Sequence, residues 1–327
     1  MTDDERVRYI NPYTDFGFKK LFGTEMNKDL LISFLNSLFE GSKREITDIQ
    51  YLNGENLGDG YGDRRSIFDV YCKTKDGGRF IVEMQKAEQS YFKDRSLYYS
   101  TFAIREQAPK GHKWNYHLED VYTVGVLNFM FANDEYPTDS FRHEIKLKDV
   151  EDNHVFYDKL TFIYLEMPKF NKTEDELETM FDKWMFVLSN LSRLLERPKA
   201  LQDRIFKKLF EQAEIAKYTQ TERRRYEASL KEYWDYTSIM DTAYRKGEKK
   251  GEEKGMMKGL KKGMKEGMKK GLEEGMEKGM EKGMEKGMEK GKMEEKVENA
   301  RKMKQLGASS DFISQVTGLS IEEINNI

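Results

Sequence analysis

Three side chains that could hold a metal ion lie on one short segment of the chain, residues 66–86. This segment reads SIFDVYCKTKDGGRFIVEMQK, with Asp69 before the Asp-Gly-Gly turn sequence and Glu83 and Gln85 after it. Two runs of β-branched, aromatic and aliphatic residues around such a turn predict an antiparallel hairpin. Side chains alternate between the faces of a strand, so any regular register that buries the two apolar faces together sets Asp69 opposite Glu83 or Gln85.

An Asp, a Glu and a Gln on one patch of sheet form an oxygen-only ligand set, which suits Mg²⁺ or Mn²⁺. Two carboxylates held close together repel each other, so without a counter-charge the pKa of at least one of them rises. A metal ion bound to Asp69 and Glu83 would polarise a phosphoryl oxygen and lower the pKa of a bound water. The alternative is a solvent-facing side of a hairpin that carries charges and holds no metal.

Helical and strand patterns surround the hairpin. Before it, Asn27–Phe39 is predicted to be a helix, and after it Tyr91–Ala108 is predicted to be another, ending before a proline. The region Asp120–Ala132 contains a near-continuous apolar run typical of a strand buried on both faces. Phe141–Leu147 and Leu160–Met167 predict further strands. These elements indicate an α/β fold with a mixed central sheet flanked by helices.

The acidic residues and the start of the chain carry a family resemblance. Asp69, a turn and Glu83-Met84-Gln85 resemble the D…(D/E)-x-K core of the PD-(D/E)XK nuclease superfamily, with Gln85 where Lys is usual. The opening NPYTDFGFKKLFG, Asn11–Gly23, is similar to the start of the recombination-promoting nuclease/putative transposase (Rpn) family, which uses an E-x-Q variant. The resemblance covers roughly residues 9–240 and implies a restriction-endonuclease-like core.

The resemblance also implies an activity and its residues. The family's activity is Mg²⁺-dependent DNA cleavage, with Asp69 and Glu83 as metal ligands and Gln85 orienting the attacking water or the scissile phosphate. An amide cannot supply the positive charge of the usual Lys. Many nucleases of the superfamily carry an acidic residue on the first helix that reaches the metal, which makes Asp15 an accessory candidate. The alternative is that Thr14 or Asp15 caps the helix that begins there.

The charge balance does not favour tight DNA binding. The net charge is −3, and the region Lys246–Lys292 carries 15 Lys and 10 Glu, so the rest of the chain carries −8. Phosphate contacts normally dominate affinity for DNA. A local basic patch could still supply them: Lys19, Lys20, Arg64, Arg65, Lys86, Lys93 and Arg95. The rival hypothesis is a catalytically degenerate nuclease fold that acts as an oligomeric DNA- or protein-binding scaffold.

Compartment and membrane association are predicted from simpler features. Cys72 is the single cysteine, so an intramolecular disulfide is excluded and a reducing compartment is indicated. The start MTDDERVRYI lacks the apolar stretch of a signal peptide, and no apolar run approaches about 18 residues. We therefore expect a cytoplasmic protein with no membrane contact.

The chain divides by composition into three predicted parts. Residues 1–245 form the nuclease-like domain, 246–292 a repeat, and 293–327 a small helical tip. The domain is expected to end, over about 173–245, in three helices: Thr173–Glu196, Lys199–Lys217 and Thr221–Tyr244. In the tip, Ser309 or Ser310 and Ser320 are expected to start short helices. The tip has the pattern of a helix-turn-helix, or it is a protein-interaction element.

The repeat places glycine at every fourth position. Twelve glycines run from Gly247 to Gly291, and four units from Met276 read Met-Glu-Lys-Gly. Each glycine costs a helix about 1 kcal/mol relative to Ala. One interpretation is a Gly/Met seam that joins two helices in a homodimer; its four-residue period would wind it right-handed by about 40° per unit. The other is a weakly helical, solvated low-complexity spacer, which the scarcity of apolar residues other than Met favours.

Overall fold

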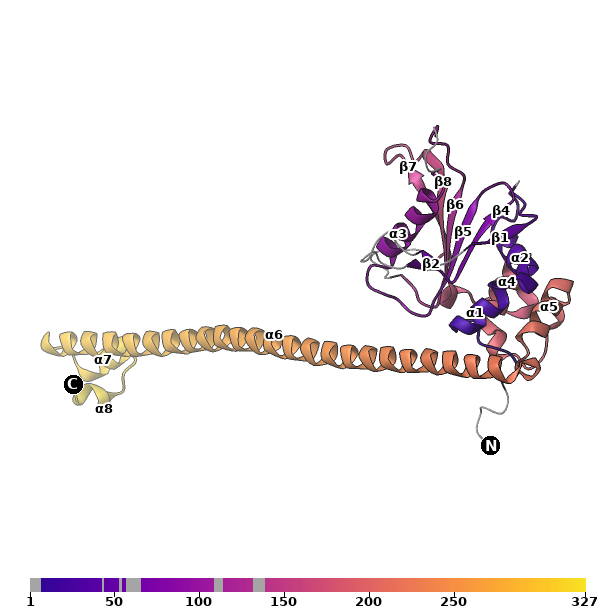
Figure 1. Ribbon diagram of the computed structural model, residues 1–327. Coiled ribbons are helices and arrows are strands. Elements are labelled where there is room, and N and C mark those ends of the chain that lie inside the picture. The colour runs from indigo at the N-terminus through magenta and orange to yellow at the C-terminus, as the bar shows by residue number, and fades with distance from the viewer. Residues whose placement is uncertain (1–6, 43, 53–54, 57–65, 109–113, 132–138) are drawn as a thin grey trace, which may run out of the picture. The chain divides into compact units, whose positions relative to one another are not determined.

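The computed structural model describes residues 7–42, 44–52, 55–56, 66–108, 114–131 and 139–327 (Figure 1). The chain forms two compact units, Met1–Ile239 and Met240–Ile327. The first unit contains the sheet and every residue proposed above for the metal site. No helix among the described residues is long and apolar enough to cross a membrane.

A mixed six-stranded sheet, ordered β1-β4-β5-β6-β8-β7, lies at the centre of the first unit. β5 pairs in parallel with β6, and β6 with β8, while the other neighbours are antiparallel. The strands are β1 (Ile49–Tyr51), β4 (Val70–Thr74), β5 (Arg79–Gln85), β6 (Val121–Leu127), β7 (Arg142–Lys148) and β8 (Val155–Glu166). A separate pair joins β2 (Glu55–Asn56) to β3 (Ser66–Ile67). The predicted strands and the mixed sheet are confirmed.

The helices cover both faces of the sheet (Figure 1). On one face lie α1 (Asp15–Phe22), α2 (Lys28–Leu38), α4 (Met180–Asn190) and α5 (Arg204–Ala213), and on the other lies α3 (Phe92–Arg105). Apart from the short β2–β3 pair, the elements α2, β1, β4, β5, α3 and β6 follow one another in the order α-β-β-β-α-β. Short 3₁₀ turns connect the elements: η2 (Glu25–Asn27), η3 (Met167–Lys169), η4 (Glu174–Glu176), η5 (Leu191–Arg193), η6 (Lys199–Leu201) and η7 (Ile215–Lys217).

The hairpin β4–β5 has the predicted antiparallel pairing, but its start differs from a regular strand. Val70 pairs with Val82, so Asp69, directly before Val70, faces Glu83 across the hairpin. Strict alternation would place Phe68 on the same face as Val70. Instead, a bend at Asp69 interrupts the extended chain, and Phe68 packs on the α3 side against Tyr71. Because helices cover both faces, both faces of this hairpin are buried, including the one that carries Glu83 and Gln85.

Two of the predicted C-terminal helices begin later than expected. Thr173 and Glu176 do form a capping box, but it starts only the turn η4, because Leu177 is extended. A second capping box, Thr179 with Asp182, starts α4. The helix predicted from Lys199 is limited to α5, with 3₁₀ turns on either side.

The third C-terminal helix does not end near Tyr244. Helix α6 (Gln220–Gln305) continues through the whole repeat. No proline lies in this range. Exposed Lys and Glu side chains one turn apart form ion pairs along the helix, for example Lys269 and Glu273 at 3.8 Å. In the tip, Ser309 caps α7 (Ser310–Thr317) and Ser320 caps α8 (Ile321–Asn325), as predicted.

Helix α1 begins at a tight cap formed by the opening motif. The Thr14 hydroxyl accepts a hydrogen bond from Gly17 N at 3.0 Å and donates one to Asn11 O at 2.7 Å. Thr14 rather than Asp15 is therefore the N-cap. A Cβ on Gly17 would lie 2.2 Å from Asn11 O, which is inside contact distance with a backbone atom. Only glycine fits at this position.

Substitution of Gly17 by Ala should destabilise the first unit. The added methyl group must displace the Asn11 carbonyl and break the cap, so we expect a loss of about 3 kcal/mol in the free energy of unfolding. Urea unfolding of the full chain, followed by far-UV circular dichroism, measures it. Gly259→Ala is the matched control, because nothing lies within 4 Å of its Cβ position. Equal unfolding midpoints for Gly17→Ala and wild type would contradict the proposed role of the cap.

Candidate metal and nuclease site

Asp69, Glu83 and Gln85 line one cavity of about 370 Å³ at the end of the hairpin. Its walls come from the hairpin, from α3 and from the first part of α6. The lining residues are Asp69, Glu83, Met84, Gln85, Lys86, Gln89, Arg95, Tyr99, Glu232 and Tyr236. The sequence-predicted trio is thus brought together from two strands, as the hairpin register requires.

Glu83 is a buried acid beside a second acid. It is 6% exposed, and the Gln85 amide donates a hydrogen bond to its Oε2 at 3.0 Å. Burial raises the pKa of Glu83 to about 8, the charge of Asp69 adds to the rise, and Arg95 and Gln85 oppose it. A carboxyl group with this pKa is mostly protonated at neutral pH, and a cation in the cavity would favour its ionised form.

Asp69 is held in place by the neighbouring strand. Its Oδ2 accepts a hydrogen bond from Met84 N at 2.7 Å. Burial raises the pKa of Asp69, whereas this hydrogen bond and the charges of Lys19 and Lys86 lower it. Both carboxyl groups therefore lie in a setting that disfavours two negative charges without a cation.

A glycine on the adjacent strand shapes the wall beside Glu83. Glu83 pairs with Gly125 on β6, and Gly125 pairs with Tyr164 on β8. A Cβ on Gly125 would lie 3.0 Å from the Tyr164 ring, so a side chain there would displace the ring. The Tyr164 hydroxyl is in turn fixed by a 2.8 Å hydrogen bond to Ser96 on α3.

Asp15 lies near the cavity but not among its lining residues. It is the first residue of α1, half exposed, and it pairs with Lys19 at 2.7 Å. Its charge contributes to the raised pKa of Asp69. Asp15 as an accessory ligand stays a prediction.

Sequence reasoning named Arg95 of α3 only as part of a basic patch, and it missed the part of the site that α6 supplies. Arg95 and Tyr99 lie one turn apart on α3, and Glu232 and Tyr236 lie one turn apart on α6. The four-residue spacing of polar and aromatic residues on α3 was the available signal. For α6, about 150 residues along the chain from the hairpin, the sequence held none.

The donor atoms suit a hard divalent cation. Among the described residues, no group of three or more His, Cys, Asp or Glu side chains is arranged to hold a metal. Mg²⁺ commonly uses only one or two carboxylates and keeps several waters. Asp69 and Glu83 fit that requirement, because both residues line the same cavity.

Most cations of the predicted basic patch are engaged by carboxylates. Lys19 pairs with Asp15, Lys20 with Glu222 at 2.6 Å, and Lys86 with Glu232 at 3.5 Å. Arg64 and Arg65 lie outside the described residues. These three lysines of the patch therefore already have carboxylate partners.

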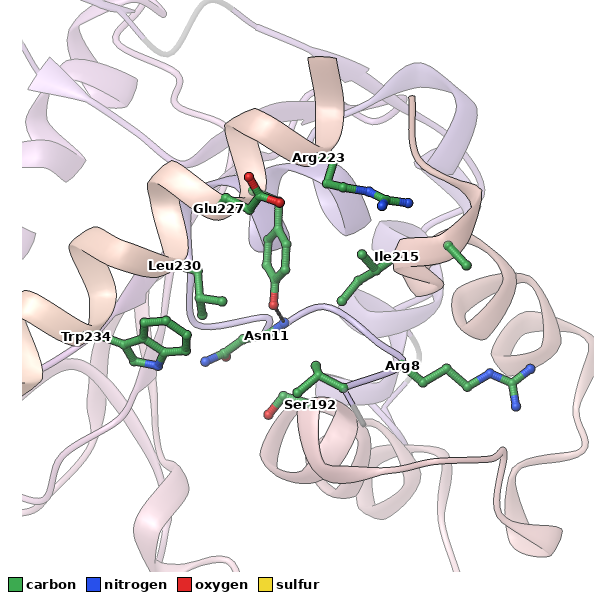
Figure 2. A pocket seen from close by; sticks show the side chains of 11 residues that line it. Arg8, Asn11, Ser192, Ile215, Arg223, Glu227, Leu230 and Trp234 are labelled. Carbon is green, nitrogen blue, oxygen red and sulfur yellow. Dashed lines mark hydrogen bonds between the residues drawn. The ribbon is translucent and has the colours of Figure 1, made fainter. Parts of the chain in front are cut away.

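A larger cavity, of about 740 Å³, lies between the N-terminal segment and the start of α6 (Figure 2). Arg8 and Arg223 border it, Trp234 lies at another part of its wall, and Tyr226 accepts a hydrogen bond from Asn11 N at 2.9 Å. Glu227 is the one carboxylate among its described lining residues. It therefore lacks the pair of acids that distinguishes the smaller cavity.

Comparison with known families agrees with this geometry. The model of the PD-(D/E)XK nuclease family transposases matches residues 12–243, more than two-thirds of the chain. The chain belongs to this family. No curated protein and no solved structure matches it. The resemblance seen in Asn11–Gly23 and Asp69–Gln85 is confirmed, and membership of the Rpn group is consistent with the match. Members of PD-(D/E)XK nuclease families usually hydrolyse phosphodiester bonds and typically use divalent metals.

The raised pKa of Glu83 predicts a pH-dependent stability for this PD-(D/E)XK protein. Between about pH 4.5 and 8 the folded chain keeps a proton on Glu83 that the unfolded chain releases, so the free energy of unfolding falls as pH rises. Gln cannot ionise, so Glu83→Gln should escape this fall. Without metal, the free energy of unfolding of Glu83→Gln should therefore rise relative to that of wild type as the pH increases from 4.5 to 8. The difference should grow by a few kcal/mol in total, and by at most about 1.4 kcal/mol for each pH unit.

Urea unfolding at pH 5, 6.5 and 8 in EDTA measures this difference. Glu281→Gln, an exposed residue of the repeat, is the control and should give the same difference from wild type at all three pH values. If the free energy of unfolding changed with pH in the same way for wild type and Glu83→Gln, the proposed effect of burial on the pKa of Glu83 would be contradicted.

Proposed function

We propose that this PD-(D/E)XK family transposase is a Mg²⁺- or Mn²⁺-dependent DNA endonuclease that hydrolyses phosphodiester bonds. Asp69 and Glu83 would hold the ion, and Gln85 would position the attacking water or the scissile phosphate. The observation that carries the proposal is the placement of a buried carboxyl group, Glu83, and a partly buried one, Asp69, in one cavity where they repel each other. Burying such a pair costs free energy, which a divalent cation offsets.

The residues around the ion would each help to fix the geometry of its ligands. When bound, the ion supplies Lewis-acid polarisation of a phosphoryl oxygen and a lowered pKa for a bound water. The Met84 N–H fixes the direction of the Asp69 carboxylate, and the Gln85 amide fixes Glu83. Burial and the charge of Glu83 raise the pKa of Tyr99 and of Tyr164, so both side chains lie near Glu83. Tyr164 is also buried.

The alternative is a degenerate nuclease fold that serves as a DNA- or protein-binding scaffold. Two observations favour it: Gln85 is neutral, and Lys19, Lys20 and Lys86 already have carboxylate partners. A scaffold would need neither an ionised Glu83 nor a metal.

Nicking of supercoiled plasmid separates the two proposals. Wild-type protein should nick the plasmid with Mg²⁺ and not in EDTA. Asp69→Ala and Glu83→Ala should each lower the rate at least about 100-fold, because each removes a carboxylate from the ion. Asp48→Ala, an exposed acid that pairs with Lys28 outside the cavity, should cleave like wild type. Equal, metal-independent traces in all four samples would leave only the scaffold.

For the repeat, we propose a solvated helical spacer, with a Gly/Met homodimer as the alternative. Nothing lies within 4 Å of the Cβ position of any of its twelve glycines, and its methionines are exposed. As part of a single chain it makes no packing contact. A homodimer seam would place a second backbone against those glycines.

Alanine at Gly275, Gly279, Gly283 and Gly287 distinguishes the two arrangements. In a spacer, each substitution should favour the helix by about 1 kcal/mol and leave the sedimentation mass unchanged. In a seam, the methyl groups would separate the two backbones and a dimer would dissociate. Circular dichroism and sedimentation velocity of the full chain measure both effects. A sedimentation mass that falls from dimer to monomer on substitution would refute the spacer.

A further inference from the structure

The proposed nuclease site has a shortage of positive charge. Two carboxylates line the cavity, a phosphodiester adds another negative charge, and its hydrolysis concentrates charge on the phosphoryl oxygens. Gln85 occupies the position at which a Lys would help to neutralise that charge, and its amide is neutral. Lys86 also lines the cavity but pairs with Glu232 at 3.5 Å, which leaves Arg95 of α3 as the other cation among the described lining residues.

Arg95 on α3 reaches the neutral amide. Its Nη2 donates a hydrogen bond to Gln85 Oε1 at 2.6 Å and lies 4.0 Å from Glu83 Oε2. The Gln85 amide therefore contacts the guanidinium with its oxygen and the Glu83 carboxylate with its nitrogen. Only this orientation of the amide satisfies both neighbours, because Arg has no acceptor and a carboxylate has no donor.

The guanidinium is held from several sides. It lies 5.8 Å from the centre of the Tyr99 ring and 6.0 Å from that of Phe92, and its Nη1 donates to Gln89. The Arg95 side chain is 28% exposed, so part of it still faces the cavity. Its Nε is buried and has no acceptor among the described residues. A planar cation fixed in this way is suited to bind two oxygens of one phosphate.

We propose that Arg95 is a catalytic residue of this site: its guanidinium supplies, from α3, the positive charge that residue 85 lacks, and contacts the scissile phosphate. This inference rests on the proposed endonuclease function. Arg95 transfers no proton, because a guanidinium stays protonated; it donates hydrogen bonds to the non-bridging phosphate oxygens. Gln85 is then the positioning residue that holds Arg95 beside Glu83.

The test compares neutral variants with a charge-restoring one in the full chain. Arg95→Met removes charge and hydrogen bonds, and Arg95→Gln removes charge but keeps a donor for Gln85. Both should nick plasmid about 100- to 1,000-fold more slowly than wild type. The double variant Arg95→Met/Gln85→Lys places an ammonium group at residue 85 on β5. It should therefore nick plasmid at least about tenfold faster than Arg95→Met.

Arg197→Met is the matched control. Arg197 also donates to a glutamine amide, Gln202 Oε1 at 2.8 Å, but it lies outside the lining of the catalytic cavity. It should nick like wild type. Urea unfolding of each variant identifies any that fail to fold, and Arg95→Gln, which keeps the hydrogen bond, replaces Arg95→Met in that case.

DNA binding gives a readout that does not depend on cleavage. With Ca²⁺ in place of Mg²⁺, the affinity for a short duplex is measured by fluorescence anisotropy at several salt concentrations. Loss of one phosphate contact lowers the slope of log K against log salt by about 0.9. Arg95→Met should show that decrease and Arg197→Met should not.

The outcomes separate this inference from the function on which it rests. If wild type nicks and both neutral Arg95 variants nick within threefold of it, the inference is overturned and the nuclease stands. If folded Arg95→Met/Gln85→Lys is no faster than Arg95→Met, charge replacement is overturned. If wild type shows no Asp69-dependent nicking, the proposed function fails, and an unchanged salt slope would then also refute the phosphate contact.

Discussion

The site depends on the burial of one carboxyl group, Glu83, next to another, Asp69. Burial in a medium of low dielectric constant disfavours the charged form, and the adjacent acid disfavours it further. Two neighbours of Glu83 limit this cost: Gln85 donates a hydrogen bond to it, and Arg95 supplies a nearby cation. A residue type that failed in any of these tasks would expose or leave unpaired a group that the sheet keeps buried.

The sheet makes this burial unavoidable. Helices cover both of its faces, so the polar side of β5 cannot face water as it would in an open hairpin. All seven residues of β5 are buried, because β4 lies on one side of the strand and β6 on the other. Glu83 and Gln85 therefore remain polar groups in a central strand, and such groups persist only with specific partners. A structural role alone would be filled more stably by apolar residues, which favours a functional one.

Much of this could be predicted from local patterns and some could not. The hairpin follows from alternation and the turn sequence, and its register follows because a shift by one residue would exchange the faces. Phe68 departs from alternation because a bend at Asp69, where the Met84 N–H binds the carboxylate, interrupts the strand. Thr173 has a true capping box that starts only a short turn, since a local motif fixes where a helix can begin and not how far it continues. Glu232 and Tyr236 reach the cavity through tertiary packing of α6, which no local pattern encodes.

The paired cations around the cavity do not prevent it from binding a polyanion. Each surface ion pair contributes only about 0–1 kcal/mol to the free energy of unfolding, because both charged side chains are already well hydrated when they are apart. The Lys20–Glu222 pair joins α1 to α6, and the Lys86–Glu232 pair joins the residue after β5 to α6; both lysines keep 21% of their side-chain surface exposed. A phosphate group can therefore take the place of a carboxylate at small cost, and it brings the release of counterions from DNA as an additional driving force. Arg95 differs from these lysines because its partners in the cavity are an amide and a carboxyl group whose pKa is already raised. A phosphate at Arg95 would therefore compete with weaker partners than at Lys20 or Lys86, which favours the cavity lined by Asp69 and Glu83 as the place where a phosphodiester would bind.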